Sequence, residues 1–160
     1  IYRNNLKKEN KNHIFRFIKK CKKKNIGFFL ANDPSFAIKI GANGVYVSSY
    51  NKEILKKNTI SRKRLELIGS AHNFKEISIK AKQGCQKIIL SRLFKTNYPN
   101  KSSFFGTTKF NLMTRNYKYR FIALGGIRNN NLMKLNITNC EGVALLSEAK
   151  KKPAIIRRLF

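Results

Sequence analysis

Three junctions in the chain share a pattern that restricts the fold more than any other feature of the sequence. They are "IKIGANGVYVSS" (38–49), "AKQGCQKIILSR" (81–92) and "NITNCEGVALLS" (136–147). Each runs from a helix end through one or two small residues into a short apolar strand with a serine at its exit. Parallel strands require a crossover connection, which is usually a helix. The repeated unit therefore predicts a parallel α/β fold.

Seven short apolar segments are the expected strands. They are continuous rather than strictly alternating, which is typical of strands buried on both faces. The seven are Ile1–Arg3, Ile26–Ala31, Gly44–Val47, Leu65–Ser70, Lys87–Ser91, Arg120–Leu124 and Gly142–Leu146. An open, doubly wound sheet remains an alternative. We favour a TIM-type (β/α)8 barrel, because seven units follow in order and no strand is followed by a GxGxxG fingerprint.

Helical periodicity marks the segments between the strands. Residues 11–24 place Ile14, Phe17, Ile18 and Cys21 at helical spacing. Residues 73–83 do the same with Phe74, Ile77 and Ala81, and Asn73 begins a pattern that resembles a capping box. Residues 128–136 and 153–159 are shorter helix candidates.

Composition limits the number of domains. A chain of 160 residues that is 42% hydrophobic can build one core, so we expect a single domain over 1–160. Three cysteines without CxxC spacing are read as reduced packing residues of a cytoplasmic protein. No apolar stretch reaches the roughly 20 residues of a membrane span, so no membrane association is expected.

The net charge of +28 would suit a polyanionic partner. The lysines are spread through almost every segment, however, and a solvated surface explains them equally well. A basic nucleic-acid-binding module remains a remote alternative, resting on the cations and aromatics that interleave over residues 104–121.

Polar and small residues follow the predicted strands. In parallel α/β proteins the site lies beyond the carboxyl ends of the strands. The candidates there are Arg3, Asn32, Asp33, Ser48, Asn51, Ser70, His72, Ser91, Thr96, Gly125, Gly126 and Ser147. In "IALGGI" (122–127), two glycines after a strand let backbone N–H groups approach an anion closely, which favours a phosphate site.

The ordered motifs resemble the thiamine-phosphate synthase and TenI-like family. The similar segments are "IYRNN", "LANDPSFA", "GANGVYVSS", "LIGSAHN", "GCQKIILSRLFKT", "FIALGGI" and "CEGVALLSEA". The resemblance covers nearly the whole chain from the family's second strand onward. It implies a barrel that lacks its first strand and helix in the sequence given, so we expect an N-terminally incomplete domain.

The resemblance implies a reaction between two phosphorylated substrates. An aminomethyl-pyrimidine pyrophosphate loses pyrophosphate, and a thiazole phosphate captures the pyrimidine, with Mg²⁺ as the cofactor. By the same resemblance Asp33 and Asn51 take the metal positions, and Asn32 and Arg3 bind the pyrophosphate. The remaining implied residues are Ser70, His72 and Thr96 as catalytic groups and Gly125, Gly126 and Ser147 as phosphate ligands.

Departures from the family pattern leave alternatives open. Asn51 replaces the second metal carboxylate, Asn5 a lysine, and Pro34 a frequent arginine, while Arg92 adds a cation. A neutral ligand at 51 weakens the hold on Mg²⁺. The alternative function is a TenI-like thiazole tautomerase, for which His72 would exchange protons, or a ligand-binding protein of the thiamine pathway. Self-association into a homo-oligomer also remains possible on the sequence alone.

Overall fold

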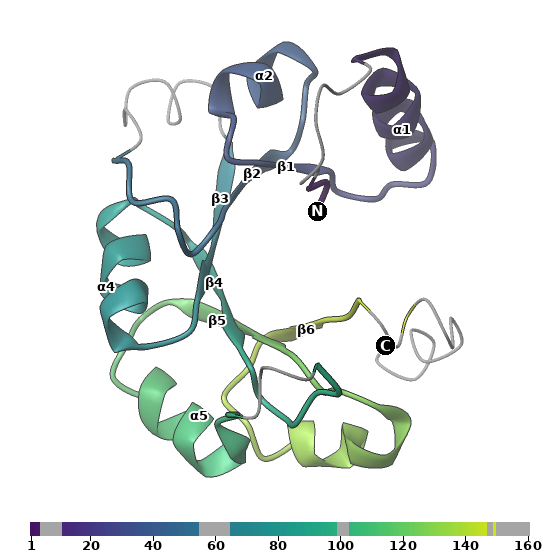
Figure 1. Cartoon of the computed structure of the whole chain (residues 1–160). Coiled ribbons are helices and arrows are strands. Elements are labelled where there is room, and N and C mark those ends of the chain that lie inside the picture. The colour runs from purple at the N-terminus through teal and green to yellow at the C-terminus, as the bar shows by residue number, and fades with distance from the viewer. Residues whose placement is uncertain (4–10, 55–64, 99–102, 147–148, 150–160) are drawn as a thin grey trace. The chain divides into compact units, whose positions relative to one another are not determined.

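The computed structural model describes residues 1–3, 11–54, 65–98, 103–146 and 149 (Figure 1). The chain divides into two compact units. Residues 1–70 with 78–86 form the first unit, and residues 71–77 with 87–160 form the second. The predicted helix at 153–159 and the candidate Ser147 lie outside the described residues.

The first unit alternates helices and parallel strands. Its elements are α1 (Lys11–Lys23), β1 (Phe29–Ala31), α2 (Pro34–Lys39), β2 (Gly44–Val47) and β3 (Glu66–Ala71). β1 pairs with β2 and β2 with β3, all parallel, in the registers Phe29↔Gly44 and Gly44↔Glu66. In Figure 1, α2 connects β1 to β2 and packs against both strands. This is the predicted βα arrangement.

The predicted strand at Ile1–Arg3 is reduced to a single bridge. Tyr2 forms one isolated parallel bridge with Leu30. Its N–H donates to the Phe29 carbonyl at 2.7 Å, and its carbonyl accepts from Ala31 N–H at 3.1 Å. Among the described residues, this first segment therefore pairs with β1 at Tyr2 alone.

The second unit continues the alternation. α4 (Phe74–Lys82) follows β3 and contributes residues to both units. The elements after it are β4 (Lys87–Ser91), α5 (Gly106–Thr114), β5 (Arg120–Leu124), a 3₁₀ helix η1 (Asn129–Leu135) and β6 (Gly142–Ala144). β4 pairs with β5 and β5 with β6, both parallel. The predicted helix at 128–136 is therefore a 3₁₀ helix, and the last strand is two residues shorter than predicted.

Strand order follows chain order in both units. The order is β1-β2-β3 in the first and β4-β5-β6 in the second. A doubly wound sheet would reverse direction at a switch point. Neither unit contains such a reversal, which favours the barrel type of connection.

Burial confirms the continuous apolar pattern in the middle strands only. All four residues of β2 are buried, and β3 and β4 each have one half-buried residue at their start. β5 alternates instead, with Phe121 and Ala123 buried and Ile122 and Leu124 half-buried. An apolar run therefore identified the strand correctly without proving that both faces are covered.

The buried face of α4 differs from the predicted one. Ile77, Lys80 and Gln83 are at most 4% exposed, whereas Phe74 is 49% exposed and Ala81 is half-buried. A lysine can occupy the buried face only when its ammonium finds hydrogen-bond acceptors. The acceptors come from the segment after β2.

Candidate active site

The exit of β1 is shaped by Asn32 and Asp33. Asn32 has φ +57°, in the left-handed region that asparagine tolerates better than most residues. Asp33 then caps α2: its Oδ1 accepts from Phe36 N–H at 2.8 Å, with Pro34 in the first turn. The lone aspartate is therefore a helix cap. Its Oδ2 makes no hydrogen bond to the described residues, and the side chain is exposed.

The Asn32 side chain ties the exit of β1 to the turn after β2. Its Oδ1 accepts from Ser48 N–H and Ser48 Oγ, both at 2.9 Å, and approaches Asn51 Nδ2 at 3.5 Å. Its Nδ2 donates to Tyr50 Oη at 3.1 Å. Three predicted site positions, Asn32, Asp33 and Asn51, therefore lie together.

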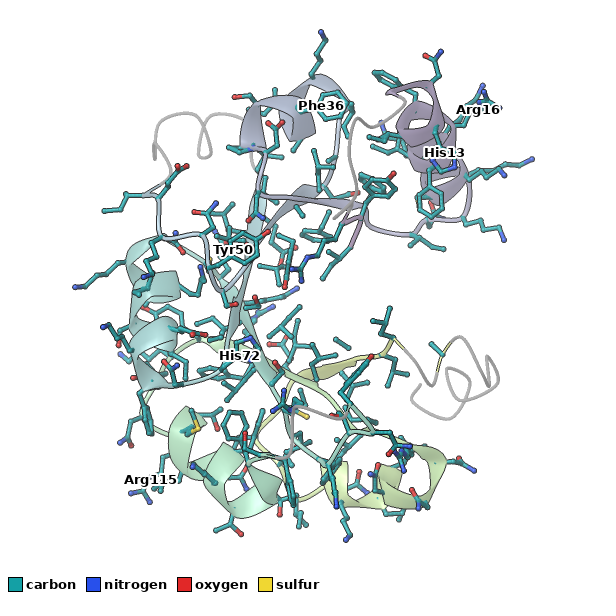
Figure 2. The ribbon with its side chains drawn as sticks, in the orientation of Figure 1. His13, Arg16, Phe36, Tyr50, His72 and Arg115 are labelled. Atoms are coloured by element: carbon teal, nitrogen blue, oxygen red, sulfur yellow. The ribbon has the colours of Figure 1, made fainter. Side chains whose placement is uncertain are left out.

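Arg3 joins this group through Tyr50, which follows β2 (Figure 2). The Arg3 guanidinium carbon lies 5.8 Å from the centre of the Tyr50 ring, a cation–π distance. The pKa of the Tyr50 phenol lies below its ordinary value, chiefly because of a hydrogen bond with Ser48, and also because of the Arg3 charge and Asn32. Tyr50 carries no motif signal, so sequence reasoning missed it.

A buried lysine lies beneath the same turn. The ammonium of Lys80 donates to the carbonyls of Ser48 and Asn51 at 2.7 and 2.6 Å and to Gln83 Oε1 at 2.9 Å. Hydrogen bonds from charged donors are worth about 1.5 to 3 kcal/mol each, which offsets the cost of burying the charge. The available signal was the helical spacing of Ile77 and Lys80, which puts the lysine on the apolar face.

Cys85 packs near this lysine, and its chemistry follows from burial. Burial raises the pKa of the Cys85 thiol from 9.0 to about 11, although the Lys80 charge opposes the rise. The thiolate is the reactive form. We expect iodoacetamide at pH 8 to modify the half-buried Cys21 and Cys140 in the native protein well before Cys85, as measured by peptide mass spectrometry.

The pH dependence of stability gives a check on Cys85. Its folded-state pKa lies above the unfolded value, so its contribution to stability is complete below about pH 9 and declines as pH rises toward 11. A Cys85→Ala variant should lack that part of the decline. In the labelling experiment, equal modification of all three cysteines by iodoacetamide at pH 8 would contradict the prediction that Cys85 reacts last.

His72 lies just after β3 and is anchored in the second unit (Figure 2). Its Nδ1 is 3.0 Å from the Ser91 carbonyl and 2.9 Å from Ser91 Oγ. Its backbone N–H donates to Glu76 Oε2 at 2.8 Å. Because a carbonyl can only accept, the short Nδ1 contact favours the tautomer with the proton on Nδ1 and leaves Nε2 as the basic nitrogen.

The Gly125–Gly126 turn is packed against the loop after β4. Gly125 and Gly126 have φ of +102° and +67°, and a Cβ on Gly126 would meet the carbonyl oxygens of Phe94 and Lys95 at 2.5 Å. Phe94 N–H also donates to the Gly125 carbonyl at 3.0 Å. The glycines are thus required by backbone geometry, independently of any phosphate.

Thr96 lies in this same loop with its hydroxyl uncommitted. Thr96 Oγ1 is buried and has no hydrogen-bond partner within the described ranges. A buried unsatisfied hydroxyl costs about 1 to 3 kcal/mol. Arg92, by contrast, is occupied: its guanidinium donates to the Ser103 carbonyl at 2.9 and 3.1 Å.

The other predicted site residues are placed as follows. Ser70 is 5% exposed near the end of β3, and Asn51 Oδ1 accepts from Glu53 N–H at 2.9 Å. Among the described residues, no three His, Cys, Asp or Glu side chains form a metal-binding group. Nor does any described helix have the length and apolarity of a membrane span.

The donor set fits Mg²⁺ in one respect. Magnesium is commonly held by one or two carboxylates together with substrate phosphates and water. Asp33 Oδ2 can serve as one such carboxylate oxygen, while the Asn51 amide oxygen is used within its own loop. Asp33 could therefore contribute one of the carboxylate ligands that such a metal requires.

These features define an α/β protein of parallel βα units with polar side chains gathered where strands end. Residues 2–149 match a family model described as thiamine monophosphate synthase, and the chain belongs to this family. The resemblance seen in the sequence is confirmed.

Curated relatives carry the same description. Thiamine-phosphate synthases from two strains of Prochlorococcus marinus are 26% and 27% identical over 79% and 80% of this chain. The chain spans only 37% and 36% of the length of these two proteins.

Solved structures support the fold. A thiamine phosphate pyrophosphorylase from Pyrococcus furiosus has a TM-score of 0.72 at 16% identity, covering 96% of this chain and 79% of that one. FabK from Thermotoga maritima has a TM-score of 0.63 at 13% identity, covering 84% and 46%. The fold is α/β with parallel strands, consistent with part of a TIM-type barrel.

Proposed function

We propose that this chain carries thiamine-phosphate synthase chemistry. An aminomethyl-pyrimidine pyrophosphate would lose pyrophosphate as its carbon–oxygen bond breaks, and the thiazole nitrogen of a thiazole phosphate would form the new bond to that carbon. The products would be thiamine phosphate and pyrophosphate. Family membership and the relatives' descriptions support this proposal. For the complete architecture we propose a (β/α)8 barrel in a single domain.

One observation carries the proposal: within the described part of the chain, Asp33 Oδ2 makes no hydrogen bond, and Asp33 follows Asn32, whose side chain connects the exit of β1 to the turn after β2. Bound Mg²⁺ would offset the charge that develops on the leaving pyrophosphate. Asp33 would hold the metal. Arg3 and the Asn32 amide would orient the pyrophosphate. Asn51 would stabilise the segment after β2 through its bond with Glu53 N–H.

Within the second unit we propose a binding site for the thiazole phosphate. The Gly125 and Gly126 N–H groups and Ser147 would bind the thiazole phosphate. The uncommitted Thr96 hydroxyl would donate to a phosphate oxygen, which would remove its desolvation cost. Ser70 is proposed as a further catalytic contact at the exit of β3.

The test is direct synthesis. Purified protein, Mg²⁺ and both substrates should yield thiamine phosphate, measured by liquid chromatography, and Thr96→Val should raise the KM for thiazole phosphate about tenfold, because one hydrogen bond to a charged group is lost. Thr108→Val, the same substitution at an exposed position of α5, is the control. No product from the wild type under these conditions would refute synthase activity.

A TenI-like thiazole tautomerase is the second candidate, favoured by the anchored His72. A ring with Nδ1 held by Ser91 presents Nε2 as a base. Isomerisation of a thiazole phosphate without thiamine phosphate formation, lost in His72→Gln, would favour it. Binding of that ligand without either reaction would indicate a ligand-binding protein of the pathway. Cytoplasmic location and a homo-oligomeric state stay predictions.

A further inference from the structure

The Lys80 side chain crosses from α4 to the turn formed by residues 48–51. The side chain is fully buried, with 0% of the residue exposed. An ammonium has three N–H donors. Here they meet three neutral oxygens: the carbonyls of Ser48 and Asn51 and Gln83 Oε1, at 2.6 to 2.9 Å. These three bonds hold the ammonium against the protein's own backbone and the Gln83 side chain.

A glycine in β3 makes room for the lysine stem. A Cβ on Gly69 would lie 2.8 and 2.9 Å from Lys80 Cγ and Cδ and 3.0 Å from Cys85 Sγ. The φ of Gly69 lies outside the left-handed region, so conformational freedom is not the reason for a glycine there. The position instead provides space through which the stem reaches the turn.

The turn at 48–51 is held from two sides. Asn32 Oδ1, from the exit of β1, accepts from Ser48 N–H and Oγ. On the other side Lys80 binds the carbonyls of Ser48 and Asn51, and Gln83 Nε2 donates to the carbonyls of Asn51 and Glu53 at 3.1 and 2.7 Å. A free loop of this composition would sample many conformations, whereas these bonds select one.

We propose that Lys80 is a positioning residue that fixes the turn at 48–51, and with it Tyr50 and Asn51, beside Asn32 and Asp33 for binding a pyrophosphate group. The identity of the ligand rests on the proposed function. The role of Lys80 in holding the turn does not, because it follows from the contacts alone.

The first measurement is amide hydrogen exchange, resolved by NMR, in Lys80→Met. Methionine keeps the length of the stem and removes the ammonium. The amides of Ser48 and Asn51 should exchange at least tenfold faster than in the wild type, while those of Ile122 and Ala123 in β5 stay unchanged. Lys82→Met, an exposed lysine in the last turn of the same helix, should change neither group.

The second measurement is binding of inorganic pyrophosphate in the presence of Mg²⁺ by calorimetry. We expect the Kd to rise about tenfold in Lys80→Met and to remain unchanged in Lys82→Met. If Lys80→Met fails to fold, Gln83→Met removes one acceptor of the ammonium and two further bonds to the turn. The same amides should then exchange faster, by a smaller factor.

Two results would overturn the inference. One is unchanged exchange at Ser48 and Asn51 in a folded variant. The other is an equal rise at Ile122 and Ala123, because that would indicate general destabilisation rather than release of the turn. If the wild type does not bind pyrophosphate, that result contradicts the proposed function. The hydrogen-exchange measurement still decides whether Lys80 holds the turn.

Discussion

If the chain has the proposed synthase activity, Asp33→Asn is expected to reduce thiamine phosphate formation by roughly 100-fold or more, while leaving the stability of the protein nearly unchanged. Asparagine caps helices about as well as aspartate, so the bond to Phe36 N–H should persist. What it lacks is the negative charge with which the second carboxylate oxygen would hold Mg²⁺. Losing about 3 kcal/mol of transition-state stabilisation corresponds to this factor. The measurement is kcat/KM together with urea denaturation.

Asp33→Ala separates the two roles of this carboxylate. Alanine removes both the charge and the cap, so it should match the activity loss of Asp33→Asn and cost about 1 kcal/mol of stability in addition. Full activity in Asp33→Asn, with loss only in Asp33→Ala, would mean that Asp33 acts purely as a helix cap.

Gly126→Ala is expected to destabilise the second unit by about 3 to 5 kcal/mol. Part of the cost is the positive φ of +67°, about 1 to 2 kcal/mol for a residue with a Cβ. The rest is overpacking, because the new methyl group would meet the carbonyl oxygens of Phe94 and Lys95, which are backbone atoms and cannot rotate away. Chemical denaturation followed by circular dichroism measures the change.

Gly106→Ala is the matched control for this substitution. Gly106 has nearly the same φ, +69°, but a Cβ there would have no neighbour within 4 Å. Its cost should be limited to the backbone term of about 1 to 2 kcal/mol. Equal destabilisation by the two substitutions would show that the loop after β4 yields to the methyl group.

The two glycines have a structural role that the sequence pattern does not reveal. The sequence "IALGGI" predicts a phosphate site, because glycine lets backbone N–H groups approach an anion. In the structure the close approach is to the backbone of the loop after β4. Phosphate binding remains the proposal, and packing alone already requires glycine at 126.

Local sequence determined where most of the strands lie, although it marked neither α2 nor α5 as a helix. β2, β4 and β5 begin and end at the predicted residues, because short apolar runs bounded by small residues carry this signal within a few positions. It also placed Asn32, Asp33, His72 and Gly125 at strand ends. These positions depend only on neighbours in the chain.

Tertiary structure alone decided what each of these side chains does. Asp33 looked like a lone metal carboxylate and is also a helix cap, while Lys80, one of 35 basic residues, is buried beneath the turn that carries Asn51. The reason is that hydrogen bonds of Lys80 join residues about 30 positions apart. No local pattern contains such a pairing, because it exists only once Lys80 in α4 lies against the turn after β2.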